Sequence, residues 1–180
     1  MPPVFVANRK FDADAGARWV RYLDWSGLHQ LQEVVSLDTV LCPTVPDQLK
    51  AEDWEHNVQA DYQISYFRSL EYLRKRVAGE PGLNVLAVLQ NPSTADLESV
   101  ELPGFRFLGF DLLDIHGDIS ALSNCGGFED VFAGSELSEH GLLPDLPRAY
   151  EVRRGLSTKH PDESHARCDV WAIWRLEFGE

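Results

Sequence analysis

The sequence predicts an α+β fold in which a mainly antiparallel sheet packs against two to four helices. In the second half of the chain, short apolar runs follow one another around tight turns, which is typical of antiparallel strands. The helical patterns are grouped elsewhere and do not alternate with every strand. With 180 residues, of which 44% are hydrophobic, the chain is long enough for one domain with a sizeable core.

The N-terminal part of the chain carries weak signals. We expect residues 1–16 to be a partly ordered segment ahead of a single α+β domain over residues 17–180, because small and polar residues dominate the start. Aromatic and β-branched residues over residues 17–25 favour an extended segment, although their pattern also fits a helix. Residues 28–35 fit either a short helical turn or the start of a strand.

Two helices are expected in the middle of the chain. Asp47 can cap the first of them, with Val58 on its apolar face. The second is expected over residues 61–77, where apolar residues recur at three- and four-residue steps. Three basic residues fill its last turn and Gly79 follows, which is typical of a helix C-terminus.

Strands are expected next. Residues 83–89 are an apolar run of the length of a buried strand. Residues 105–114 and 119–123 are typical of two strands joined around Gly117, since glycine can adopt the positive φ of a tight turn.

The last two expected elements are a helix and a strand. Asp145 can cap a helix that ends near Lys159, with a proline in its first turn. The pattern over residues 168–178 predicts a strand. Trp171 and Trp174 are three residues apart in that strand and should point to opposite faces, so we expect one of them on an exposed or partner-covered face.

Charge is distributed unevenly along the chain. Residues 77–147 contain one basic and twelve acidic residues, so they carry −11 of the formal net charge of −13. Such a surface repels nucleic acid and anionic lipid and attracts basic proteins, unless the acids serve only solubility. The acids expected to bind a basic partner are Asp111, Asp114, Asp118, Glu129, Asp130, Glu136 and Glu139.

The cysteines and the apolar runs bear on the compartment. The three cysteines are odd in number and far apart, which favours free thiols in a reducing environment. The start of the chain lacks the pattern of a secretory signal, and no apolar run approaches the roughly 20 residues of a membrane span. We therefore expect a cytoplasmic protein that does not insert into a membrane.

Cys125 lies in the most distinctive loop, Ser-Asn-Cys-Gly-Gly-Phe at residues 123–128. Consecutive glycines expose backbone N–H groups, and a neighbouring histidine can take the proton of a nucleophilic thiol. His116, His140 and His165 are candidate bases, and we take His165 with Cys125 as the candidate catalytic pair. The simpler interpretation is a small buried cysteine in a tight turn.

Metal sites and cofactors are not expected. His160, His165 and Cys168 fall within nine residues, but structural zinc sites usually bring their ligands as two tight pairs. The aspartates at positions 111, 114 and 118 lack the alternating ligands and terminal glutamate of a calcium loop. Phosphate-binding and dinucleotide-binding motifs are also missing from the sequence.

Several segments together resemble small acidic bacterial proteins. They include Ile-Ser-Ala-Leu-Ser-Asn-Cys-Gly-Gly-Phe at residues 119–128 and the stretches 22–28, 35–38, 41–43, 109–114 and 165–174. The resemblance implies a compact acidic intracellular protein and brings no activity, cofactor or catalytic residue. In general character the chain is also similar to bacterial immunity proteins that neutralise toxins.

The sequence thus suggests two functions. The first is a non-enzymatic protein-binding module, immunity-like in character, whose acidic half docks a basic protein by charge and aromatic contacts. The alternative is a small cysteine-dependent enzyme that uses Cys125 with a histidine base.

Overall fold

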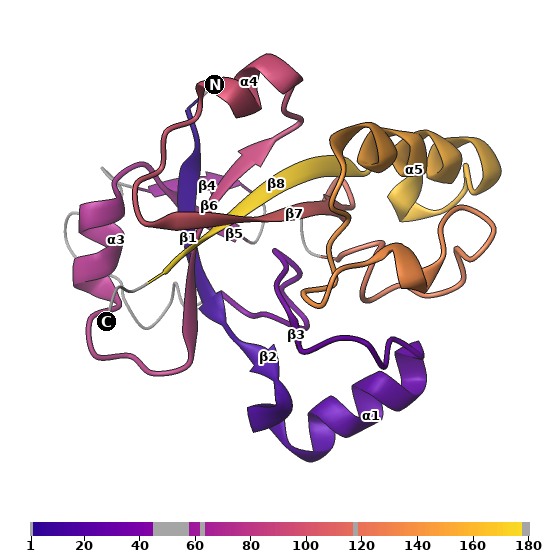
Figure 1. Ribbon diagram of the computed structural model, residues 1–180, viewed down its shortest axis with the longest axis horizontal. Helices are drawn as coiled ribbons and strands as arrows, with labels where there is room; N and C mark the ends of the chain where they lie inside the picture. Colours follow the sequence, from indigo (N-terminus) through magenta and orange to yellow (C-terminus); the bar gives the residue numbers. More distant parts are fainter. Residues whose placement is uncertain (1, 45–57, 62–63, 117–118, 178–180) are drawn as a thin grey trace.

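A six-stranded antiparallel sheet forms the centre of the molecule (Figure 1). The computed structural model describes residues 2–44, 58–61, 64–116 and 119–177. The strand order is β4-β5-β1-β6-β8-β7, and a separate pair joins β2 and β3. The strands are β1 (Val4–Arg9), β2 (Phe11–Asp12), β3 (Glu33–Val34), β4 (Val58–Asp61), β5 (Ile64–Phe67), β6 (Leu83–Gln90), β7 (Phe105–Leu113) and β8 (Asp169–Leu176). With its helices, this sheet confirms the predicted α+β class.

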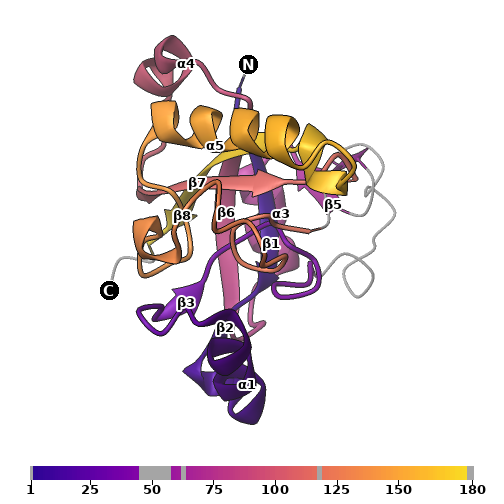
Figure 2. The same cartoon turned by 90° about the vertical axis from the view of Figure 1, so that its right-hand side faces the viewer.

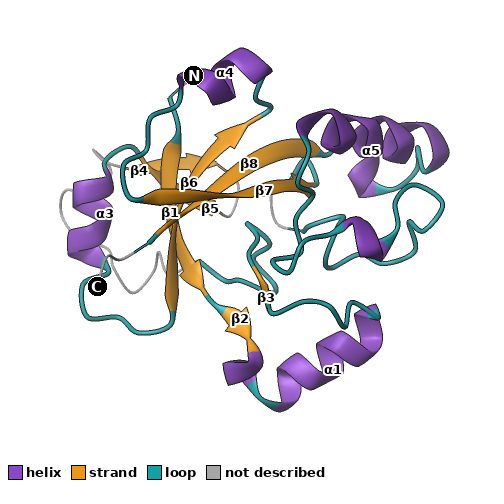
Figure 3. Ribbon diagram, viewed as in Figure 1, coloured by secondary structure: helices purple, strands orange, loops and turns teal. Residues whose placement is uncertain are grey.

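Helices and short 3-10 turns surround the sheet. They are η1 (Ala13–Ala15), α1 (Ala17–Ser26), α3 (Leu70–Arg76), α4 (Thr94–Ser99), η2 (Gly134–Glu136), α5 (Leu146–Lys159) and η3 (Ser164–Arg167). Among the described residues, no helix has the length and apolarity that crossing a membrane requires. Figure 2 shows α5 running across β7 and β8, and Figure 3 shows α1 beyond β2 and β3, away from the large sheet.

The central strand β6 is buried on both faces. On one face, Ala87 and Leu89 of β6 join buried residues of α5 such as Val152, and Val85 of the same strand packs with Leu73 of α3. Loops cover the opposite face of this strand. Their residues Val35, Leu37 and Leu142 pack there in one cluster with Leu86 and Val88 of β6. A strand that is covered on both sides has no polar face, which is why β6 is a continuous apolar run.

The structure corrects the expectation that residues 1–16 are a partly ordered segment, because part of this segment is a strand of the large sheet. Residues 4–9 form β1, an inner strand that pairs with β6 on one side and with β5 on the other. Asn8 is fully buried and its Nδ2 donates to the carbonyl of Ser36 at 2.6 Å. Residues 4–9 are ordered because they are buried between β5 and β6, two strands that are distant in the sequence. The composition of residues 4–9 does not show that these strands will lie beside them.

The expected extended segment at residues 17–25 is the helix α1. Trp19 and Tyr22 lie three residues apart on its buried face, whereas Val20 and Trp25 point outward with 56% and 59% of their surface exposed. The helix ends at Gly27, whose positive φ of 70° lets its N–H bond the carbonyl of Leu23. Its many aromatic residues resemble a strand in composition but have the three-residue spacing of a helix.

The two expected helices in the middle of the chain are largely absent from the described part. Residues 47–57 lie outside the described residues, and Val58 belongs to β4. The helix expected over residues 61–77 is correct only from Leu70 onward, where Ser69 caps α3 through the backbone N–H of Tyr72. Its earlier part contains β5, so one apolar pattern spans two elements.

The last third of the chain follows the expectations more closely. The strand at residues 83–89, the helix capped by Asp145 and the final strand are confirmed as β6, α5 and β8. Residues 119–123 do not form a strand, because only Ser120 bridges to Leu113 of β7. The two tryptophans of β8 point to opposite faces as expected, but the expectation that one of them lies on an exposed face is wrong. Both are buried, because Trp171 stacks on Tyr66 and Trp174 packs against Phe107.

Replacing Gly109 with alanine should destabilise the protein, because the edge strand β7 has no room for a side chain at this position. Gly109 lies at a register shift in β7 with φ +141°, and a Cβ there would lie 2.7 Å from the carbonyl oxygen of Leu143. We expect Gly109→Ala to lower the free energy of unfolding by about 2–4 kcal/mol, measured by urea denaturation. The control Gly79→Ala, with φ +85° and open space around it, should cost about 1 kcal/mol. Equal losses would show that the close approach of Leu143 is unimportant.

Candidate functional site

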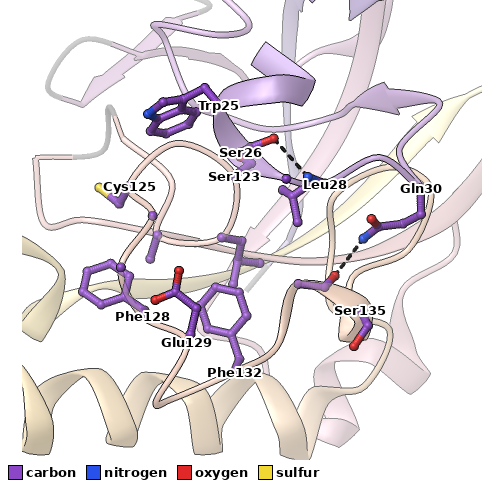
Figure 4. A pocket seen from close by; sticks show the side chains of 16 residues that line it. Trp25, Ser26, Leu28, Gln30, Ser123, Cys125, Phe128, Glu129, Phe132 and Ser135 are labelled. Carbon is purple, nitrogen blue, oxygen red and sulfur yellow. Dashed lines mark hydrogen bonds between the residues drawn. The ribbon is translucent and has the colours of Figure 1, made fainter. Parts of the chain in front are cut away.

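A pocket of about 910 Å³ opens between the C-terminal end of α1 and the segment that follows β7 (Figure 4). We call it the α1 pocket. Its lining residues are 25–28, 30, 121–123, 125–129, 132, 134 and 135. Trp25 forms part of one wall, and Phe128 and Phe132 belong to the other. The pocket is within the size range of ligand-binding sites in proteins.

Hydrogen bonds join the two walls of the α1 pocket. Gln30 Nε2 donates to the carbonyl of Gly134 at 2.8 Å, and the Tyr22 hydroxyl donates to the carbonyl of Ser123 at 2.7 Å. The chain at Gly134 lies so close to Leu28 that a Cβ would be 2.6 Å from Leu28 Cδ2. The wall that carries Phe128 is therefore fixed at one end to α1 and at the other to the segment that follows α1.

Asp38 positions the loop that leads to Cys125. Its side chain is fully buried, and one carboxylate oxygen accepts hydrogen bonds from the backbone N–H groups of Val40 and Leu41. The other oxygen accepts from the N–H of Ser120 at 2.8 Å and from Asn124 Nδ2 at 2.9 Å. Asp38 thus connects the loop after β3 to the loop before Cys125.

Asp111 forms the second half of this buried network. Its carboxylate accepts from the hydroxyls of Ser36 at 2.5 Å and Ser120 at 2.6 Å, and from the backbone N–H of Leu112. Burial raises the pKa of Asp111, and its hydrogen bonds to Ser120 and Ser36 oppose that effect. Asp111 therefore has a structural role in the core.

The acidic docking surface predicted from the sequence is corrected accordingly. Asp111 and Asp114 are buried, so they cannot contact a partner directly, and Asp118 lies outside the described residues. Some acids of a sequence cluster can point into the core, as Asp111 of β7 does. Neither the composition of the cluster nor the spacing of its acids shows which of them are buried.

The four other predicted acids lie nearer the surface, but three of them already contact a basic group. Asp130 binds His160 Nε2 at 2.9 Å and the side chain of Lys159. Glu136 binds Arg148 Nε at 2.6 Å. Glu139 Oε1 lies 3.7 Å from His140 Nε2. Glu129 lines the α1 pocket and has neither a hydrogen bond nor an ion pair to any described residue.

The structure brings together the candidate catalytic pair. Cys125 Sγ lies 3.2 Å from His165 Nε2 and 3.5 Å from His165 Nδ1, although the two residues are 40 positions apart. The hydroxyl of Ser164 lies 3.2 Å from His165 Nδ1, and the ring of Phe128 packs on His165 at 5.7 Å. The other candidate bases lie elsewhere: His116 is exposed, and His140 contacts Glu33.

Both members of the pair are held in their neutral forms. Burial raises the pKa of the Cys125 thiol to about 11, and the negative charges of Asp38, Asp114 and Glu163 act in the same direction. Burial lowers the pKa of His165 below its ordinary value. At neutral pH the contact therefore joins a thiol to a neutral imidazole, which is the form that can accept a proton.

The three residues considered as metal ligands, His160, His165 and Cys168, each contact different neighbours. His160 contacts Asp130, His165 contacts Cys125, and Cys168 is fully buried in the core. Within the described ranges, no group of three or more metal-ligating side chains is present.

Sequence reasoning missed the aromatic and polar lining of the α1 pocket. The loop at residues 123–128, which carries Ser123 and Phe128, was singled out from the sequence for Cys125, but its position opposite Trp25 and Phe132 was not expected. The one sequence signal for this lining is Trp25 directly before Ser26-Gly27 at the end of an amphipathic segment.

Comparison of the chain with protein-family models, with curated proteins and with solved structures finds no match.

The protonated state of Cys125 predicts a steep pH dependence of its alkylation. Because only the thiolate reacts, the rate of iodoacetamide labelling should rise about tenfold per pH unit between pH 7 and pH 9. Glu163→Gln removes an exposed negative charge that raises the thiol pKa, so labelling at a given pH should become faster, by about twofold. Mass spectrometry of the labelled peptide provides the rate.

The matched control is Glu98→Gln, an exposed acid on α4 that is not among the charges acting on Cys125. It should leave the rate unchanged. A rate that is flat from pH 7 to pH 9 would show that the thiol is already ionised and would contradict the assignment.

Proposed function

We propose that this protein is a non-enzymatic binding module that docks a basic protein at the α1 pocket. The observation that carries the proposal is the composition of this pocket. Its walls are largely apolar and aromatic, and Glu129 is the only charged residue among the described residues that line it. Large aromatic side chains beside a few polar groups are characteristic of the energetic centre of a protein interface.

Two further features support docking of a protein. Trp25 has 59% of its surface exposed, and an exposed tryptophan beside a pocket offers a large contact area at low entropic cost. The formal net charge of −13 attracts a basic partner over distances comparable with the Debye length. Charge then accelerates association, and the aromatic contacts supply affinity.

The chemistry of the pocket also favours binding over catalysis. The thiol that borders it has a pKa near 11 and is surrounded by acids, whereas an activated cysteine usually lies near positive charge. Steric and electrostatic occlusion of a basic surface needs no reactive group.

Capture from the native host at low salt, with elution by a salt gradient, tests this function. A basic protein should be retained by the wild type and lost on Trp25→Ala, since that change removes the exposed wall of the pocket. Val20→Ala is the matched control, because Val20 is equally exposed on α1 and does not line the pocket. A basic partner that Trp25→Ala retains as well as the wild type would place the interface elsewhere.

A second candidate function rests on the contact between Cys125 and His165. An ester carbonyl in the α1 pocket could be attacked by Cys125 Sγ, with the thiol proton passing to His165 Nε2 as the S–C bond forms and the carbonyl electrons move to oxygen. When the carbonyl forms again, the bond to the alcohol breaks, His165 returns the proton to the departing oxygen, and a thioester remains on Cys125. The backbone N–H groups of Gly126 and Gly127 make no hydrogen bond with the described residues and could stabilise that oxygen.

The reaction of the protein with p-nitrophenyl acetate separates the two candidates. If His165 is the base, His165→Gln should slow acylation of Cys125 by about 100-fold or more, and Cys125→Ser should abolish the thioester seen by mass spectrometry. Thermal unfolding of each variant controls for loss of the fold. A folded His165→Gln variant with the wild-type rate would eliminate the enzymatic candidate.

A further inference from the structure

We infer that the α1 pocket recognises an arginine side chain of the partner, with the guanidinium between Trp25 and the wall that carries Glu129. This inference rests on the proposed docking function and adds the chemical identity of the anchoring group. It depends on one carboxylate, three aromatic rings and one buried hydroxyl that all line the same pocket.

The carboxylate of Glu129 is available to a ligand. The neighbouring acids Asp130 and Glu136 are bound to Lys159 and Arg148, but Glu129 has no such partner among the described residues. Among the described residues, the lining of the pocket contains no lysine, arginine or histidine. A cation that enters would therefore meet one uncompensated negative charge and no repelling group.

The aromatic rings favour a cation with a flat apolar surface. In the view of Figure 4 the Glu129 carboxylate lies between the rings of Phe128 and Phe132, and Trp25 comes from the α1 wall. Aromatic faces attract cations, and tryptophan does so most strongly. A guanidinium can stack on such a ring because it is planar and weakly hydrated, whereas an ammonium is compact and strongly hydrated.

A buried hydroxyl supplies the second polar requirement. Ser123 lines the pocket with only 3% of its surface exposed, and its Oγ has no hydrogen-bond partner among the described residues. Buried hydroxyls are normally hydrogen-bonded, so this one is suited to a donor from a ligand. Arginine has five N–H donors, enough for a two-pronged bond to a carboxylate and a further bond to a hydroxyl.

The size of the pocket indicates that the arginine arrives as part of a chain. A volume of about 910 Å³ exceeds what one side chain fills, so a neighbouring apolar residue of the partner can contact Leu28 and Leu122. A partner protein is thus favoured over a small free cation. An acidic ligand is disfavoured by Glu129 and by the net charge of −13.

Calorimetry with short peptides tests the inference. The probes are acetyl-Leu-Arg-Leu-amide and the same peptide with citrulline, which keeps the shape of arginine but has no charge. The arginine peptide should bind the wild type at least tenfold more tightly than the citrulline peptide. Glu129→Gln should remove that preference, and Glu98→Gln on α4 should retain it. The indole N–H signal of Trp25 should shift on binding.

Three results would overturn the inference: no binding of the arginine peptide, equal affinity for arginine and citrulline, or an unchanged preference in Glu129→Gln. If they occur while Trp25→Ala still loses a captured partner, the docking function stands and only the arginine anchor fails. If the arginine peptide binds as expected but Trp25→Ala retains the partner, the pocket binds arginine peptides and the partner docks elsewhere, so the docking function at this pocket fails.

Discussion

The buried network around Asp38 is the interaction on which the rest of the site depends. Four donors from two distant loops converge on one carboxylate that has no access to water. A buried carboxylate is stable only when its hydrogen bonds are satisfied, so the loop after β3 and the loop before Cys125 must keep their relative positions. Ser120 extends the network to Asp111 on β7 and thereby attaches both loops to the sheet.

The same network sets the electrostatics of the pocket. The charges of Asp38 and Asp114 raise the pKa of Cys125, so the groups that position this loop also keep its thiol protonated. The imidazole of His165 is neutral through burial and lies 3.2 Å from the sulfur. Structure and reactivity are coupled here, because any change that weakens the buried carboxylates alters both the shape of the wall and the state of the thiol.

The position of α1 determines which aromatic residues reach solvent. Trp19 and Tyr22 pack with Phe11 in the core, at ring distances of 5.3 Å and 5.2 Å, and this packing fixes the rotation of the helix. Trp25 is one helical turn beyond Tyr22 but lies past the edge of that core, where the α1 pocket opens. A helix anchored by two aromatic residues therefore presents a third to a partner, and Glu129 faces the same opening from the chain segment after β7.

The sequence by itself determined the α+β class, the C-terminal end of α3, both ends of α5, and the strands β6 and β8. These elements have strong local signals, such as a capping aspartate, a continuous apolar run or basic residues in a last turn. Only the tertiary structure decided that residues 4–9 are an inner strand, that Asp111 and Asp114 are buried, and that Cys125 meets His165. The physical reason is that these properties depend on neighbours far away in the chain, and no local pattern records which strand, loop or helix will cover a given side chain.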